Sequence, residues 1–193
     1  MSMGALAATA MEAASAEVKR ANALWEAFAK SPSRGFTMRA GHIGWSHAQN
    51  LRIEGVLDEI RVTLEYVITD LTGRTVAMAT PPKPLLGHVE ITPEGIGSKL
   101  AKLFGGQDLV MGHEAFDKKY IVKATQEATA RALLDAHVCE RLFKIDAARF
   151  TYDDGARGAG GGIVTIERPK VEDREDALDT MMQLVARMAK IQP

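Results

Sequence analysis

The 193-residue sequence has little cysteine, and this scarcity excludes whole classes of protein. Its only cysteine, Cys139, rules out an intrachain disulfide and has no CxxC partner. The residue falls in a stretch with a helical pattern beside Glu140 and Arg141, which indicates a structural or semi-exposed thiol and not a nucleophile. A lone thiol fits a reducing compartment, so we expect a cytoplasmic protein.

Long apolar runs and an excess of one charge are also missing. No stretch approaches the roughly 18 apolar residues that a membrane-spanning helix needs. The first 20 residues lack the positive leading segment of a signal peptide, and Glu12 interrupts a weak apolar run. The formal net charge is −1, from 24 basic and 25 acidic side chains, so we expect no nucleic-acid partner. Hydrophobic residues make up 46% of the chain, enough for an ordinary globular core.

An N-terminal helix is predicted over residues 5–30, where apolar side chains are spaced alternately by three and four. Pro32 disfavours its continuation. The apolar stripe can dock on the rest of the molecule, or it can pair with a second copy or another protein. We therefore divide the chain into a helix and linker, 1–35, and a single domain, 36–193. Trp25 and Phe28 are the candidate partner contacts on the helix.

A mainly antiparallel sheet is predicted after this helix. Residues 36–50 show no clean period and are expected to form a loop. From Leu51 the period becomes two, and "LRIEGVL", "IRVTLEYVIT" and "TVAMAT" predict a three-stranded meander. Gly55 suggests a bulge in its first strand. Further strands are expected at "HVEIT" and around "YIVKA", and "ARFTYDD" with "GIVTIERP" predicts a hairpin.

Two amphipathic helices are predicted in the second half, over residues 126–145 and about 172–190. In the first, Glu127, Arg131 and Asp135 stand four apart as favourable ion pairs. His137 falls on its apolar side, where a hydrogen-bonded core histidine is expected. The buried stripe of the second helix comprises Leu178, Met181, Met182, Val185, Met188 and Ala189. Because helices and strands do not alternate strictly, the expected fold class is α+β.

The segment "GIGSKLAKLFGG", residues 95–106, has apolar side chains on one stripe and two lysines away from it. Two helical turns bury too little surface for stable membrane binding. We therefore expect a short helix packed on the sheet, and a membrane or protein contact is the alternative. The residues of that alternative contact are Ile96, Lys99, Leu103 and Phe104.

Motifs for catalysis and metal binding are weak. The glycine-rich stretch 155–162 lies between two predicted strands, so it indicates a hairpin tip and not a phosphate-binding loop. No GxSxG motif is present, no carboxylate stands in an apolar strand position, and the five histidines lack a recognisable metal-ligand spacing. We expect neither a metal nor a cofactor. One loop, with His42, Trp45 and His47, is the candidate ligand site.

The segment from residue 112 to 142 resembles a bacterial domain family of unknown function. Its signature is a Phe-Asp pair, an aromatic-x-Val strand and a helix with Ala-x-x-Leu-Leu. The matching residues are Phe116, Asp117, Tyr120, Val122, Ala130, Leu133 and Leu134. The resemblance implies no catalytic residues, and the membrane-spanning helices of better-known members have no counterpart in helix 5–30. Physically, Phe116, Tyr120 and Val122 are expected in the core, and Asp117 is expected to fix a turn as an acceptor.

These observations favour a non-enzymatic binding or scaffolding module. Its partner is expected to be another protein or a second copy of the chain. The alternative is a small-molecule-binding protein or an enzyme that uses the His42–His47 loop, which a deep pocket lined by these residues would support.

Overall fold

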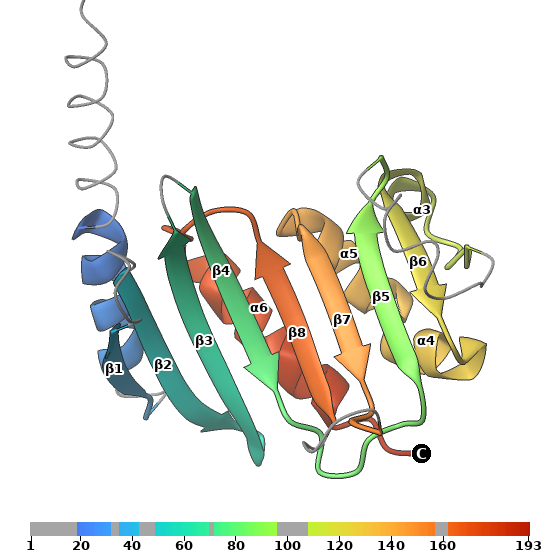
Figure 1. Ribbon diagram of the computed structural model, residues 1–193, viewed down its shortest axis with the longest axis horizontal. Coiled ribbons are helices and arrows are strands. Elements are labelled where there is room, and N and C mark those ends of the chain that lie inside the picture. Colours follow the sequence, from blue (N-terminus) through green and yellow to red (C-terminus); the bar gives the residue numbers. More distant parts are fainter. Residues whose placement is uncertain (1–18, 32–34, 43–48, 70–71, 96–107, 157–161) are drawn as a thin grey trace, which may run out of the picture.

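The computed structural model describes residues 19–31, 35–42, 49–69, 72–95, 108–156 and 162–193. They form an eight-stranded sheet in which every neighbouring pair is antiparallel (Figure 1). Across the sheet the strands are β1 (Thr37–His42), β2 (Gln49–Leu57), β3 (Ile60–Thr69), β4 (Thr72–Ala79), β8 (Ile163–Arg168), β7 (Arg149–Asp153), β5 (His88–Pro93) and β6 (Tyr120–Ala124). The predicted α+β fold class, the β2–β3–β4 meander and the β7–β8 hairpin are confirmed.

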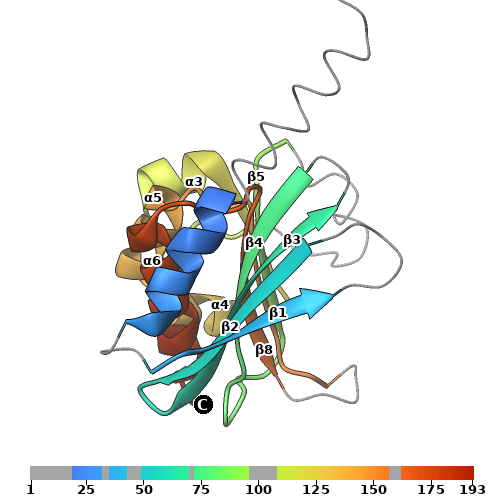
Figure 2. The same cartoon turned by 90° about the vertical axis from the view of Figure 1, so that its left-hand side faces the viewer.

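The described helices lie on one face of the sheet (Figure 2). They are the helical residues 19–30, α3 (Glu114–Lys119), α4 (Glu127–Leu133), α5 (Ala136–Lys144) and α6 (Glu175–Ala189). The segment 95–106, with its predicted short helix, falls outside the described residues from residue 96 onward. The sheet thus has one face covered by helices and one face that no described helix covers.

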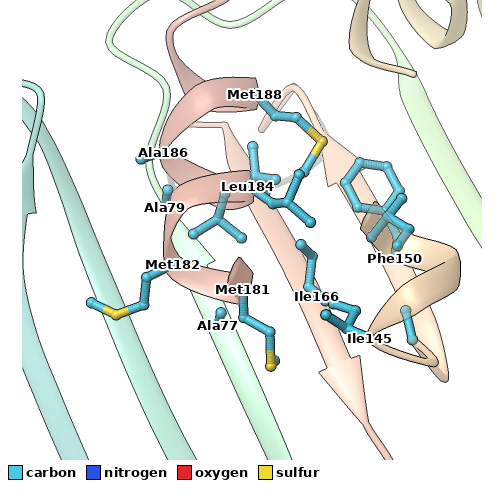
Figure 3. Packing of buried hydrophobic residues seen from close by; sticks show 14 of the residues in the cluster. Ala77, Ala79, Ile145, Phe150, Ile166, Met181, Met182, Leu184, Ala186 and Met188 are labelled. Carbon is cyan, nitrogen blue, oxygen red and sulfur yellow. The ribbon is translucent and has the colours of Figure 1, made fainter. Parts of the chain in front are cut away.

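The centre of the core lies between α6 and the middle strands. Leu64, Ala77 and Ile166 are direct neighbours in the ladders of β3, β4 and β8. Figure 3 shows Met181, Met182 and Leu184 of α6 above these strands. Because β4 presents alanines here, the helix can approach the sheet closely and fill the space with flexible methionines. The predicted stripe on this helix is buried throughout.

The described part of the N-terminal helix packs into the same core. Trp25 is 0% exposed, and its ring meets Tyr66 edge to face at a centroid distance of 5.1 Å. Its Nε1 donates a hydrogen bond to the carbonyl oxygen of Glu172 at 2.9 Å. Phe28 is also buried. Residues 19–30 therefore dock on the sheet, and Trp25 and Phe28 do not form a free partner contact.

The first strand was missed because its own sequence gives no clear period. Residues 37–42 were expected in a loop but pair with β2, with Arg39 opposite Arg52. Such an edge strand depends on its neighbour more than on its own propensity. Gly55 forms no bulge, because it pairs in register with Val62. A Cβ atom there would lie 2.0 Å from the ring of Phe36, so close packing explains this glycine.

The predicted helix over 126–145 is two helices, and the break changes which side chains are buried. Asp135 ends the first pattern and caps α5, where its side chain accepts a hydrogen bond from the Val138 N–H at 2.8 Å. The positions that face the core are therefore counted afresh from this cap in α5. His137 is consequently exposed, and the expectation of a core histidine was wrong. The Glu127–Arg131 ion pair is present at 2.7 Å.

The segment that carries the family resemblance, residues 112–142, contains α3, β6, α4 and most of α5. Phe116 and Tyr120 are buried and lie 4.9 Å apart between ring centroids, as expected for core residues. The carboxylate of Asp117 accepts three backbone N–H groups from residues 111–113, each at 2.9 Å. This carboxylate fixes the turn before α3, which confirms the role predicted for it.

Candidate binding surface

The helix-free face of the sheet carries a different class of side chain from the core face. Because strand residues alternate between faces, the neighbours of each residue that faces the helices point away from them. On β3 the core side includes Val62 and Leu64, whereas Arg61 and Glu65 lie on the opposite side. We call this opposite side the open face.

Most charged groups on the open face are paired across strands. Arg52 contacts Glu54 at 2.6 Å and Glu65 at 3.7 Å. At the far side of the sheet, two nitrogens of Arg149 hold Oε1 of Glu90 at 2.7 and 2.8 Å, and Glu90 is only 3% exposed. A carboxylate this buried requires such a partner. These pairs neutralise the carboxylates of the face but leave part of its positive charge unmatched.

The unmatched charge lies over β1, β2 and β3. Arg39 and Arg61 are exposed, and within the described part of the chain neither contacts a carboxylate. Arg39 stands directly opposite Arg52 in the ladder, an arrangement of like charges that destabilises a sheet. The three arginines, with Glu54 among their neighbours, line a shallow hollow of about 590 Å³. We call Arg39, Arg52 and Arg61 the arginine corner.

Sequence reasoning missed this corner because it depends on strand register. Arg61 was correctly placed on the polar side of its strand, but Arg39 was assigned to a loop. The sequence signal that could have identified the corner was an arginine on the outward-facing side of each of three neighbouring strands. Only the pairing of β1 with β2 brings Arg39 beside Arg52.

The candidate residues chosen from the sequence are not brought together by the described residues. Trp25 and Phe28 are in the core. The backbone of His42 belongs to β1, but its side chain, Trp45 and His47 lie outside the described residues. The same is true of the alternative contact formed by Ile96, Lys99, Leu103 and Phe104. The proposed ligand loop and the 95–106 contact therefore stay predictions.

The remaining reactive groups of the described residues have structural surroundings. Burial raises the pKa of the Cys139 thiol to about 12, so the thiol is protonated and unreactive at neutral pH. Glu90 of β5 and Glu172, which lies between β8 and α6, are buried carboxylates, and each is paired with an arginine. In the described ranges no group of three or more His, Cys, Asp or Glu residues could hold a metal ion. The helices described here include none that is long and apolar enough to cross a membrane.

Comparison of the chain with protein-family models, curated proteins and solved structures gave no match. The resemblance of residues 112–142 to a bacterial domain family accordingly stays a prediction.

Proposed function

We propose that this chain is a non-enzymatic binding module that recognises an acidic segment of a partner protein through the arginine corner. The observation that carries the proposal is the exposure of Arg39 and Arg61 without carboxylate partners among the described residues. Arg39 stands directly opposite Arg52, and like charges in this arrangement destabilise the free protein. A bound carboxylate relieves that repulsion, so part of the binding energy comes from the protein's own charge arrangement.

The spacing of the corner suits an extended peptide. Arg39 and Arg61 are separated by two strand spacings across the sheet and by four residues along it, since Arg61 pairs with Val56 and Arg39 with Arg52. With about 4.8 Å between strands and about 3.3 Å per residue, their Cα atoms are about 16 Å apart. An extended segment covers that span in about five residues. Two acidic residues about five positions apart can therefore meet the two arginines together.

The guanidinium group of arginine favours a carboxylate of the partner as the group that it binds here. Each guanidinium presents a planar fork of donors that matches a carboxylate in two parallel hydrogen bonds. Glu54 and Glu65 already occupy Arg52, so Arg39 and Arg61 are the two guanidiniums that remain open to a ligand. Exposed ion pairs are individually weak, about 0.2–1 kcal/mol each. We expect modest affinity that falls as salt is added.

The test is the binding of a fluorescein-labelled peptide with two glutamates five residues apart, followed by fluorescence anisotropy. Arg39→Glu/Arg61→Glu is expected to weaken binding at least tenfold. The matched control is Arg20→Glu/Lys83→Glu, which changes the net charge equally at exposed positions outside the corner. Equal weakening by the control, or no binding by the unaltered chain in low salt, would contradict the proposal.

A further inference from the structure

A second hollow lies on the helical side of the sheet, between α5 and α6. It consists of two adjoining spaces of about 520 and 350 Å³, and His137 and Arg141 line both. Thr180 and Gln183 of α6 stand across from Arg141 of α5 and bond to it. The combined space falls within the range of small-molecule sites. We call it the α5–α6 groove.

The groove is rich in cations, and most of them are already paired. Asp135, just before α5, holds Arg187 at 2.6 Å, and Asp58 of the β2–β3 turn holds Lys190 at 3.3 Å. At the other end, Lys144 contacts Glu140 at 2.7 Å. Arg174 likewise contacts Glu172 at 3.2 Å. These pairs leave little free charge on the walls of the groove.

Arg141 is different from these cations. Its Nη2 lies 3.2 Å from the Thr180 hydroxyl oxygen and 3.2 Å from Oε1 of Gln183, both uncharged acceptors. No carboxylate pairs with Arg141 within the residues that the structure describes. A guanidinium has five N–H donors, and both of these bonds use the same nitrogen. Arg141 is thus held in one orientation while its charge and its remaining donors stay available.

The apolar surface beside Arg141 is small. Leu57 is partly exposed in the larger space, whereas Leu184 and Ile145 are at most 4% exposed. A ligand therefore finds room for a small apolar group next to Leu57 in addition to its anionic group. One available guanidinium matches a single negative charge, which favours a carboxylate over a phosphate dianion.

We propose that the α5–α6 groove binds a small amphipathic carboxylate, whose carboxylate group accepts hydrogen bonds from Arg141 and whose apolar part lies against Leu57. The site is independent of the arginine corner, because the two surfaces are on opposite faces of the sheet (Figure 2). The competing explanation is that Arg141 only fastens α5 to α6 through Thr180 and Gln183.

Gln183→Glu separates these two explanations. The substitution keeps the size of the side chain and gives Arg141 a carboxylate partner, so the contact between Arg141 and α6 is kept. It removes the bond that the Gln183 amide donates to Asp179 at 2.5 Å, so stability is measured as well. The same carboxylate neutralises the guanidinium that the ligand needs. A purely structural Arg141 predicts no change in ligand binding of the folded chain, whereas the proposed site predicts its loss.

The experiment is an NMR titration of the full chain with benzoate, with benzamide as the neutral counterpart and inorganic phosphate as the alternative anion. Benzoate is expected to cause saturable shifts in α5 and α6 with a dissociation constant below about 5 mM. Gln183→Glu is expected to weaken binding at least tenfold in a chain that stays folded, with a small loss of stability because the exposed bond to Asp179 is removed. The control Gln126→Glu adds the same charge at an exposed position of α4 and is expected to leave binding unchanged.

Three results would overturn the proposal. The first is the absence of saturable benzoate shifts, or equal shifts with benzamide. The second is tighter binding of phosphate than of benzoate. The third is unaltered benzoate binding in Gln183→Glu, or equal weakening in Gln126→Glu.

Discussion

Replacing Glu172 by alanine is expected to lower the free energy of unfolding by about 3–5 kcal/mol, the usual effect of leaving one member of a buried ion pair without its partner. Glu172 is 0% exposed and Arg168 is 5% exposed, and their side chains form an ion pair within the core face. Burial already lowers the pKa of Arg168, which shows how poorly its charge is solvated. Without the carboxylate, the cationic guanidinium would face an apolar core.

The size of the loss in unfolding free energy also depends on which hydrogen bonds of residue 172 the substitution leaves intact. The Glu172 N–H donates to the Thr75 hydroxyl at 2.8 Å, and its carbonyl accepts from Trp25, and neither bond involves the side chain. The lost terms are the pairing with Arg168, the contacts with Lys170 and Arg174, and the bonds that the carboxylate accepts from the N–H groups of residues 173 and 174. For a domain of this size, about 2–4 °C per kcal/mol predicts a melting temperature about 6–20 °C lower.

The assay is urea unfolding followed by circular dichroism. As a matched control, Glu114→Ala removes an exposed carboxylate whose pair with Lys118 is worth less than about 1 kcal/mol. The double variant Arg168→Met/Glu172→Leu replaces the pair with apolar side chains and is expected to recover most of the stability. The reasoning fails if Glu172→Ala costs no more than the control, or if the double variant is less stable than the single one.

Four further outcomes are expected. Phe116→Ala empties a fully buried aromatic site and should cost about 3–5 kcal/mol in urea unfolding; a loss below about 1 kcal/mol would contradict the core assignment. Cys139 should react with a thiol reagent at pH 8 only after denaturation, because burial raises its pKa to about 12, and fast reaction of the native chain would refute this. Glu59→Gly should raise stability by about 0.5–1 kcal/mol, since φ is +71° there; a decrease in unfolding free energy would argue against strain at this turn. The hydrogen bond from Lys119 lowers the pKa of Asp146. Their pair therefore stabilises the fold above the unfolded pKa of about 3.9, and this stabilisation is lost as pH falls through the lower folded pKa. The stability difference between Asp146→Asn and the unaltered chain should vanish in acid, and a difference that persists there would contradict the pairing.

The strands after β1 and the last helix were predictable because each follows one hydrophobic period over enough residues. On β3 the alternation from Ile60 to Tyr66 defines both faces without reference to any neighbour. On α6 the methionines and Leu178 give a continuous stripe. In both elements local pattern and tertiary burial agree, so the period alone identifies the buried face.

The features that were not predicted depend on contacts between distant residues, or on one side chain that bonds to the nearby backbone and so interrupts a helix. The break before α5 arises because the Asp135 side chain caps a new helix, although the apolar spacing continues through it. Arg39 is part of a strand only because β2 offers an unpaired edge. The environment of Glu172 requires Thr75 and Trp25, which are 97 and 147 residues away in the chain. No window of sequence contains these partners.

The two proposed sites differ in how their arginines, Arg39 and Arg141, are held in the free protein. Each site can therefore serve as a control for the other. Arg39 is part of an unsupported edge strand and repels Arg52, so a partner that binds it should also stabilise β1 against unfolding. Arg141 is already oriented by Thr180 and Gln183, so a ligand there needs little ordering of the protein. Because the sites share no residues and lie on opposite faces of the sheet, their effects should add. Arg39→Glu/Arg61→Glu should therefore leave benzoate binding unchanged, and Gln183→Glu should leave binding of the acidic peptide unchanged. Cross-effects of tenfold or more would show that the two surfaces are coupled through the sheet or that one substitution disturbs the fold.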